Sequence, residues 1–357
     1  MKQYLDLLRE ILRDGREKES ARPNMPKTFG INRAMIKMDL QNGFPLLTTK
    51  QMPIKIIIYE LLWFLKGDTN IKYLVDNDIK IWNGDAYRWY LKYAEQNGGE
   101  DQNGILKKNP DGTYKVFLMN EFIEEIKNGN QSTYKEYKMG DLGKIYGTQW
   151  RNQNGVDQIK DVIDNLRNNP YSRYHIIDAW NKVDFPDMAL PPCHLLYQFL
   201  VNPLTDGERI LIYYQGSDGA TSIPHYQNEN ITQYLDLCNV PKFYLDLNMY
   251  QRSCDTFLGV PFNLASMSLL LLIIAKVSNM LPGIATWIGG DVHLYLDHIL
   301  LAKEQIEREP YELPHLSINK IIDTLDDILQ LTVDDFELIN YRSHPPIKAE
   351  LFTGLKQ

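Results

Sequence analysis

Cysteine is scarce in this sequence. The 357 residues include three cysteines, Cys193, Cys238 and Cys254. An odd and widely spaced set of this kind is a poor basis for a disulfide framework and fits a reducing compartment. The N-terminal segment also lacks the apolar stretch and small-residue cleavage site of a secretory signal. We therefore expect a cytoplasmic protein.

Long hydrophobic runs are also missing. The most apolar segment, 262–281, is interrupted by polar residues, and its longest unbroken apolar run is LLLLIIA. A helix that spans a bilayer needs about 20 predominantly apolar residues. We therefore predict a buried core helix here and expect no membrane association.

An excess of positive charge is absent, because 38 Lys and Arg face 46 Asp and Glu, for a formal charge of −8. Sequence-independent nucleic-acid binding depends on clustered cations, so no obligate nucleic-acid partner is expected. The seven histidines show no ligand spacing with Cys or acidic residues, which argues against a metal site. Gly-rich dinucleotide and Walker fingerprints are missing as well.

The apolar content, 44% of the chain, is sufficient for a large core. Apolar residues at helical spacing predict helices over 5–11, 54–65, 262–280 and 295–308. Runs rich in β-branched and aromatic residues predict strands over 29–40, 142–150, 175–180, 195–201 and 243–250. The polar segment 14–28, with two prolines, is predicted to be a loop. This mixture indicates an α+β (or α/β) protein with a central mixed sheet flanked by helices.

Two polar stretches are typical of surface insertions. Residues 84–140 are rich in Lys, Asn, Glu and Tyr and contain the turn signals NGG and NPDG. Residues 202–241 contain DGER, GSDGA and NEN. We interpret the chain, 1–357, as a single catalytic domain that carries these two insertions.

Cys193 follows two prolines in MALPPCHLLYQF and directly precedes a predicted strand. The prolines restrict the approach to the thiol and remove backbone donors. A single cysteine is more often a small buried hydrophobic residue than a nucleophile. Catalysis would require a neighbour, such as an arginine or a helix N-terminus, that stabilises the thiolate.

A second segment, QRSCDTFLGVPFNLAS, concentrates polar groups around an apolar turn. One interpretation is a solvated loop that enters a helix capped near Asn263. The other is a recognition site in which Arg252 and Ser253 bind a phosphate and the Asn263 amide binds a pyrimidine edge. This segment alone leaves both interpretations open.

Together, these segments resemble the thymidylate synthase family. LPPCHLLYQF, YQRSCDTFLGVPFNLAS and GGDVHLYLDHI occur in the order of the family signature. Further matching blocks are GFPLLTTK, YELLWFLKGDTNI, IYGTQWR and INYRSHPPIKAE. The blocks cover roughly half to two thirds of the chain and leave out both predicted insertions.

The resemblance implies transfer and reduction of a methylene group from 5,10-methylenetetrahydrofolate to C5 of dUMP. Cys193 would be the thiolate that attacks C6, with Arg252 favouring its ionised form and holding the nucleotide phosphate beside Ser253. Asn263 would bind pyrimidine O4 and N3, and its amide suits uracil better than cytosine. No metal is implied.

Other catalytic roles follow from the same resemblance. Glu60 would relay protons through water, because burial in an apolar helix would raise its pKa usefully. A structural partner for Glu60 is the alternative, and Tyr146 taken alone would be a core residue. By resemblance, Tyr146 helps to remove the C5 proton, and His194 and Gln251 support the same pocket.

The implied folate site contains an acid and an apolar seat. Asp255 would bind the pterin ring, and Lys50 would meet the anionic tail of the folate, although a solvated lysine is the alternative. The residues that would contact the folate rings are Ile81, Trp82, Leu258, Gly259 and Phe262. His293 and Tyr295 would bind the deoxyribose hydroxyl, although each would otherwise be a core residue.

The sequence departs from the family pattern in three places. Members carry two adjacent arginines that reach the partner subunit's phosphate site, whereas here Arg173 is followed by Tyr174. Arg22 matches the arginine of a loop near the start, but that loop is shorter. The C-terminus ends in the polar sequence AELFTGLKQ instead of a short apolar tail.

Three functions therefore remain open from the sequence. The first is thymidylate synthase, acting as a homodimer that packs sheet against sheet and shares Arg173 across the interface. The second is a dUMP, or less readily dCMP, hydroxymethylase of the same fold, in which water captures the intermediate. Trp82 favours methylation, because the family's tryptophan keeps water away. The third is a regulator that binds nucleotide or RNA without catalysis, against which the retained nucleophile argues.

Overall fold

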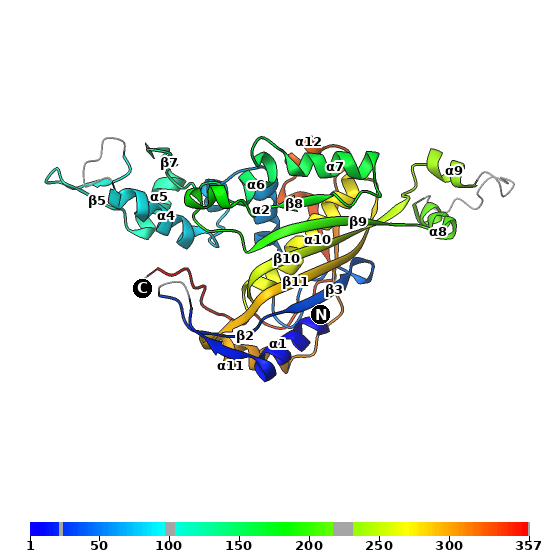
Figure 1. Ribbon diagram of the computed structural model, residues 1–357, viewed down its shortest axis with the longest axis horizontal. Helices are drawn as coiled ribbons and strands as arrows, with labels where there is room; N and C mark the ends of the chain where they lie inside the picture. The colour runs from blue at the N-terminus through cyan, green and yellow to red at the C-terminus, as the bar shows by residue number, and fades with distance from the viewer. Residues whose placement is uncertain (21–23, 97–103, 217–230, 356–357) are drawn as a thin grey trace.

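A mixed sheet forms the centre of the computed structural model, which describes residues 1–20, 24–96, 104–216 and 231–355 (Figure 1). The strands run in the order β1-β2-β11-β10-β9-β8, and β3 pairs with β11 beside β2. Their bounds are β1 (Arg16–Lys18), β2 (Thr28–Ile31), β3 (Ala34–Asp39), β8 (Ile176–Asp178), β9 (His194–Pro203), β10 (Phe243–Asp255) and β11 (Leu281–Tyr295). The expected central mixed sheet is confirmed.

The parallel pair β10 and β11 determines where functional groups meet. Parallel neighbours need a crossover connection, and here it is the long helix α10 (Gly259–Val277). The register pairs Asp255 with His293, so both strands end at the same edge of the sheet. The antiparallel strand β9 begins at that edge, because Gln251 is paired with His194.

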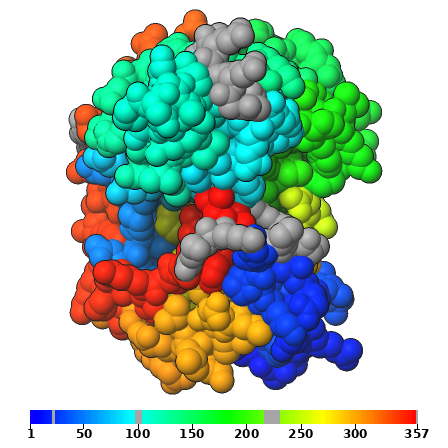
Figure 2. Space-filling model, turned by 90° about the vertical axis from the view of Figure 1, so that its left-hand side faces the viewer, coloured from blue at the N-terminus to red at the C-terminus, as the bar shows by residue number. Residues whose placement is uncertain are grey.

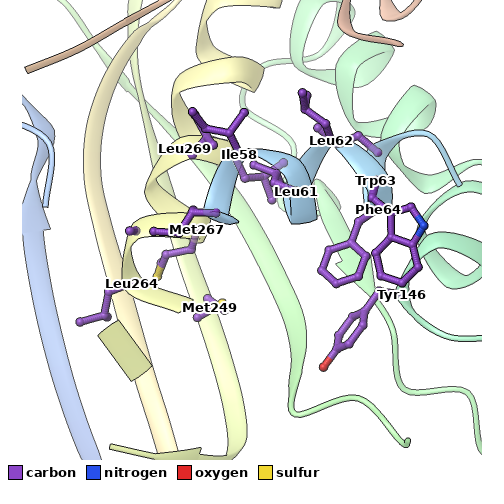
Figure 3. Packing of buried hydrophobic residues seen from close by; sticks show 14 of the residues in the cluster. Ile58, Leu61, Leu62, Trp63, Phe64, Tyr146, Met249, Leu264, Met267 and Leu269 are labelled. Atoms are coloured by element: carbon purple, nitrogen blue, oxygen red, sulfur yellow. The ribbon is translucent and has the colours of Figure 1, made fainter. Parts of the chain in front are cut away.

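Helices cover one face of this sheet and enclose the core (Figure 1). Figure 3 shows Ile58 and Leu61 of α2 (Ile54–Leu65) beside α10, while Phe64 packs next to Tyr146. Phe64 is 1% exposed, and truncation of such a side chain to alanine typically costs about 3–5 kcal/mol. The other helices of this body are α1 (Lys2–Asp14), α3 (Lys72–Asp76), α6 (Tyr146–Asn152), α7 (Gln158–Asn168), α11 (Ile299–Ile306) and α12 (Leu325–Leu329).

Helix α10 is long and apolar enough, by length and composition, to cross a membrane. However, 72% of its most apolar window is buried inside the protein. Leu264, Leu269 and Ile273 are completely enclosed. This is the environment of a core helix, as the sequence predicted.

The two stretches expected as insertions carry their own small elements, and both project from the central body (Figure 1). The first contains α4 (Asn83–Gln96), β4 (Lys107–Lys108), β5 (Tyr114–Lys115), α5 (Met119–Lys127), β6 (Thr133–Tyr134) and β7 (Tyr137–Lys138). The second contains α8 (Asp206–Gly216) and α9 (Ile231–Leu237). Near the C-terminus, β12 (His315–Ile318) and β13 (Phe336–Ile339) form a separate two-stranded antiparallel sheet. The division into one domain with two insertions remains a prediction.

Several predicted elements are wrong in type or extent. Residues 142–150 were predicted as a strand, but α6 occupies most of this segment, because Tyr146 and Trp150 lie four residues apart and are buried on one helical face. The predicted loop 14–28 contains the charged edge strand β1. Residues 295–298 complete β11 and a 3₁₀ turn, and helix α11 begins only at Ile299.

Candidate active site

The candidate site lies at the edge where β9 begins and β10 and β11 end. This register brings Cys193, Arg252, Asp255 and His293 to one edge, although they are far apart in sequence. Helix α2 contributes Glu60 to the same region, and the N-terminal part of α10 contributes Asn263. The sheet topology therefore explains why the sequence motifs converge.

Arg252 encloses the segment that carries Cys193. Its Nε and Nη2 donate to the carbonyl oxygens of Pro192 and Pro191, at 2.7 and 2.8 Å. Nη2 also lies 4.0 Å from the Cys193 Sγ, and the Arg252 N–H donates to the Cys193 carbonyl. The guanidinium packs over the Trp180 ring at 5.3 Å. A fixed positive charge beside a partly exposed thiol favours the thiolate.

Tyr146 supports the other side of the nucleophile. The Cys193 N–H donates to the Tyr146 hydroxyl at 2.7 Å. The Tyr146 ring stacks on His194 at 4.3 Å between centroids. Burial raises the pKa of Tyr146 well above its usual range, so this phenol stays protonated at neutral pH.

His194 is held as a neutral imidazole. Burial lowers its pKa to about 4, and its Nδ1 lies 2.6 Å from the Tyr197 hydroxyl. A proton on this ring would have to be desolvated among aromatic side chains, which disfavours the charged form. At neutral pH His194 can therefore order its neighbours by hydrogen bonding and stacking but carries no charge.

Glu60 has the partner that an acid in an apolar helix requires. Trp82 Nε1 donates to Glu60 Oε1 at 2.8 Å. Burial raises the pKa of Glu60 to about 7, and the Trp82 hydrogen bond partly opposes this effect by stabilising the carboxylate. A carboxyl group with this pKa can both donate and accept a proton near neutral pH.

A chain of hydrogen bonds orients the Asn263 amide. Gln251 Nε2 donates to Asn263 Oδ1 at 3.0 Å, and the Gln251 Oε1 accepts from Trp287 Nε1 at 2.8 Å. The indole can only donate, so it determines which end of the Gln251 amide faces Asn263. Asn263 lies within α10 and does not cap that helix, which begins at Gly259.

The segment from Asp255 to Phe262 forms a partly exposed apolar surface beside the Asp255 carboxylate. Asp255 Oδ1 accepts from the backbone N–H groups of Phe257 and Leu258, each at 3.2 Å. Leu258 and Phe262 retain partial exposure. A Cβ added at Gly259 would lie 3.5 Å from the Asp255 Cβ, an ordinary contact, so the protein itself does not require glycine there.

Lys50 is buried, at 4% exposure, instead of projecting into solvent. Its Nζ donates to the Phe257 carbonyl at 2.5 Å and lies 4.0 Å from the Phe257 ring centroid. Burial lowers the pKa of Lys50 to about 7, while Asp255 opposes that effect. Contact with a folate tail therefore stays a prediction, and the side chain now has a second role in fixing the turn before α10.

His293 and Tyr295 lie next to each other at the end of β11, with ring centroids 5.5 Å apart. His293 Nδ1 is 3.2 Å from the Asp291 carbonyl oxygen. Ser253 is paired with Asp291 on the neighbouring strand, which places it at the same edge. Ile81 and Trp82 precede α4, where Trp82 is in reach of Glu60 as described.

The predicted arginines are not all brought to this site. Arg173 is exposed, and its carbonyl accepts from Gln198, five residues along β9 from Cys193. At about 3.3 Å per residue this is roughly 16 Å from the nucleophile. The neighbouring Tyr174 is 90% exposed. Arg22 lies outside the described residues.

Sequence analysis missed several groups that shape the site. Trp180 lies under Arg252, and Tyr197 binds His194. The neighbouring sequence marks neither residue as part of a site, because both are aromatic residues in ordinary apolar surroundings. Arg88, which donates to the carbonyl oxygens of Ala189 and Thr353, was also missed, because these contacts depend entirely on the tertiary structure. Among the described residues, no group of three or more His, Cys, Asp or Glu could hold a metal ion.

The sequence is similar to known proteins along nearly its whole length. The thymidylate synthase family profile matches residues 2–353. The chain belongs to the thymidylate synthase family. A thymidylate synthase of Mycoplasma mobile is 40% identical over 352 residues, covering 98% of this chain and 99% of its own. Thymidylate synthases of Mesoplasma florum and Mycoplasma pneumoniae are each 39% identical over 353 residues, covering the same shares.

Membership of the thymidylate synthase family confirms the resemblance and the α+β fold class. The match runs through both polar stretches, which the sequence motifs had left out. The roles of individual residues rest on the geometry of the site.

Proposed function

We propose that this chain is a thymidylate synthase that converts dUMP into dTMP with 5,10-methylenetetrahydrofolate as cosubstrate. The observation that carries the proposal is the placement of Cys193 between the Arg252 guanidinium and the Tyr146 hydroxyl. Binding alone would need no thiol that is held in this way. Family membership over residues 2–353 supports the same activity.

Cys193 would begin the reaction as a nucleophile. Its thiolate would form a bond to C6 of the pyrimidine, and the electron pair of the C5–C6 double bond would move toward C5 and O4. Arg252 would favour the thiolate before attack and, with Ser253, would hold the nucleotide phosphate. Asn263 would bind O4 and N3, with its amide orientation set by Gln251.

Protons would be exchanged through Glu60 and water. A pKa of about 7 allows Glu60 to supply a proton toward O4 and to recover it later in the cycle. Tyr146 would assist loss of the C5 proton by orienting the accepting water, because its raised pKa keeps the phenol neutral. His194 would order this water and ring network without changing charge.

The residues around Asp255 fit a flat heterocycle with a polar edge. Leu258, Phe262 and Trp82 would hold the folate rings, and Asp255 would accept from a ring N–H through Oδ2. The folate supplies the one-carbon unit and the hydride. Trp82 would restrict water near the reacting carbon, and no observation favours the hydroxymethylase over methylation.

A homodimer would complete the site. The open face of the sheet presents Met35, Tyr250, Ile284 and Ile288, which are between 36% and 60% exposed. Two copies packed through this face would bury these side chains. Arg173, exposed at a distance from Cys193 of its own chain, would then reach the partner subunit's phosphate site. A cytoplasmic enzyme fits the three free cysteines.

Product analysis tests the proposal directly. Purified protein is incubated with dUMP and 5,10-methylenetetrahydrofolate, and nucleotide and folate products are identified together by chromatography and mass. We expect dTMP and dihydrofolate. Hydroxymethyl-dUMP with tetrahydrofolate would instead establish the hydroxymethylase, and nucleotide binding without turnover would contradict both enzymes.

A further inference from the structure

The C-terminal tail is attached to the large body of the protein through Phe352. Its ring stacks on His298 at 5.3 Å and meets the Tyr295 ring edge at 4.9 Å. His298 Nε2 lies 3.1 Å from the Glu350 carbonyl oxygen. Since Tyr295 ends β11, this anchor fixes the tail at the same edge of the sheet as the candidate site.

The next residue of the tail is attached to the opposite side, on helix α4. Arg88 Nη1 donates to the Thr353 carbonyl oxygen. A Cβ added at Gly84 would lie 2.7 Å from Thr353 Cγ2, so this glycine leaves just enough room for the tail. Figure 2 shows the tail, in red, in the hollow between the cyan part that contains α4 and the blue and orange part below.

Arg88 also contacts the segment that leads to the nucleophile. Its Nη2 donates to the Ala189 carbonyl at 3.1 Å and to Asp85 Oδ1 at 2.6 Å. Ala189 is four residues before Cys193, and the intervening prolines are fixed by Arg252. Two arginines from different elements therefore bind carbonyl groups of one short, stiff segment, 189–192.

These contacts give Arg88 a role beyond its ion pair with Asp85. An i,i+3 pair with Asp85 alone would be an ordinary feature of an exposed helix. Arg88 instead bonds to three segments through the two Nη atoms of one planar guanidinium, a geometry that the single nitrogen of a lysine does not reproduce. Its side chain is 29% exposed, which leaves these bonds partly shielded from water.

We propose that Arg88 is a positioning residue that couples the seating of the C-terminal tail to the position of the Cys193 segment. When the tail is seated, Thr353 orders Arg88, and Arg88 holds Ala189 and hence the approach to the nucleophile. The unusual polar tail would thereby exclude water at the moment when the thiol is correctly placed. This proposal rests on the proposed function for its catalytic consequence but not for its structural one.

Carboxypeptidase digestion tests the structural step without any need for turnover. We expect release of C-terminal residues, followed by mass, to be about tenfold or more faster in Arg88→Gln than in wild type. Gly84→Ala should show the same change, since its methyl group displaces Thr353 while Arg88 is intact. Lys92→Gln, which removes a cation from the same helix, is the matched control and should digest like wild type.

Steady-state kinetics test the catalytic step. We expect kcat in Arg88→Gln and Gly84→Ala to fall about tenfold or more, with little change in KM for dUMP, and Arg88→Lys to be intermediate. Thermal unfolding of each variant shows whether the substitution has impaired folding.

Unchanged digestion in both variants overturns the coupling between Arg88 and the tail. Faster digestion with a wild-type kcat overturns the catalytic role of that coupling. If wild type produces no dTMP, the proposed function fails, while digestion still decides whether Arg88 holds the tail.

Discussion

Arg252 places a guanidinium nitrogen 4.0 Å from the Cys193 sulfur while donating to the carbonyl oxygens of both preceding prolines. One side chain thus fixes the position of the nucleophile and supplies the charge beside it. Prolines have no N–H, so their carbonyl groups are the only backbone hydrogen-bonding groups at these two positions. The PPC sequence and Arg252 therefore act as one unit.

Replacement of Arg252 tests this unit. In Arg252→Gln, we expect the rate of Cys193 alkylation by iodoacetamide at pH 7 to fall about tenfold to a hundredfold, since a charged hydrogen bond contributes about 1.5–3 kcal/mol. Arg252→Lys should be intermediate, because it keeps the charge but loses the planar contacts. The measurement needs a Cys238→Ser background, because Cys238 is exposed while Cys254 is buried. Equal alkylation rates in all three proteins would refute the effect of the charge.

The raised pKa of Glu60 predicts a pH-dependent stability. Folding favours the protonated acid, so this contribution is complete below the unfolded pKa of 4.5 and is lost as pH rises through about 7. Between pH 4.5 and 8, wild type should lose up to about 3 kcal/mol of unfolding free energy relative to Glu60→Gln. Urea unfolding of both proteins measures this difference. Parallel stability curves for the two would show that Glu60 is not protonated by folding.

The hydrogen bond from Trp82 to Glu60 predicts the direction of a pH shift in activity. The indole N–H stabilises the carboxylate, so its removal in Trp82→Phe should raise the Glu60 pKa further. If protonated Glu60 acts as the acid, the pH at which kcat declines on the alkaline side of the pH–rate profile should move upward. This shift is expected even if the absolute rate falls. A decline that moves to lower pH, or stays in place, would contradict this arrangement.

The bond from Gln251 to Asn263 predicts a change in nucleotide preference. In Asn263→Asp, the carboxylate can no longer donate to O4 but can accept from a cytosine amino group. We expect kcat/KM for dUMP to fall and the preference to shift toward dCMP, by about 1.5–3 kcal/mol or more. Competition assays with both nucleotides measure the ratio. Unchanged discrimination would remove Asn263 from base recognition.

The exposed position of Arg173 predicts complementation between subunits. Cys193→Ser should abolish turnover while leaving dUMP binding measurable, and Arg173→Gln should strongly reduce activity. If Arg173 serves the partner subunit, an equimolar mixture with exchanged subunits contains hybrids with one intact site. Activity should then recover to roughly a quarter of the wild-type value. Recovery should be absent if Arg173 acts within its own chain.

The sequence predicted the core elements well, because their patterns are strong. The helix over 54–65 coincides with α2, since nearly every position is apolar and no breaker interrupts it. Strand β10 continues to Asp255, whereas the prediction ended at 250. The polar residues of QRSCD are typical of a loop, but they lie in β10, where Gln251 and Cys254 are buried while Arg252, Ser253 and Asp255 keep partial exposure.

The sequence predicted those candidate site residues that belong to characteristic motifs. It did not predict the contacts that depend on tertiary packing. Cys193, Arg252 and Asn263 were found from their motifs. Lys50 was expected to meet the folate tail, which stays a prediction, but its burial against the Phe257 carbonyl and ring was not predicted from the sequence. Arg88 could not be found, because its partners Ala189 and Thr353 lie 101 and 265 residues away in sequence.

The position of the tail has a consequence for protein synthesis. Phe352 and Thr353 are translated long after α4 and β11, yet they contact both elements. While these residues are still inside the ribosome, the chain can fold its sheet but cannot place the tail against Arg88. The contact between Arg88 and Thr353 would therefore form only after this segment has left the ribosome, late in the folding of the chain.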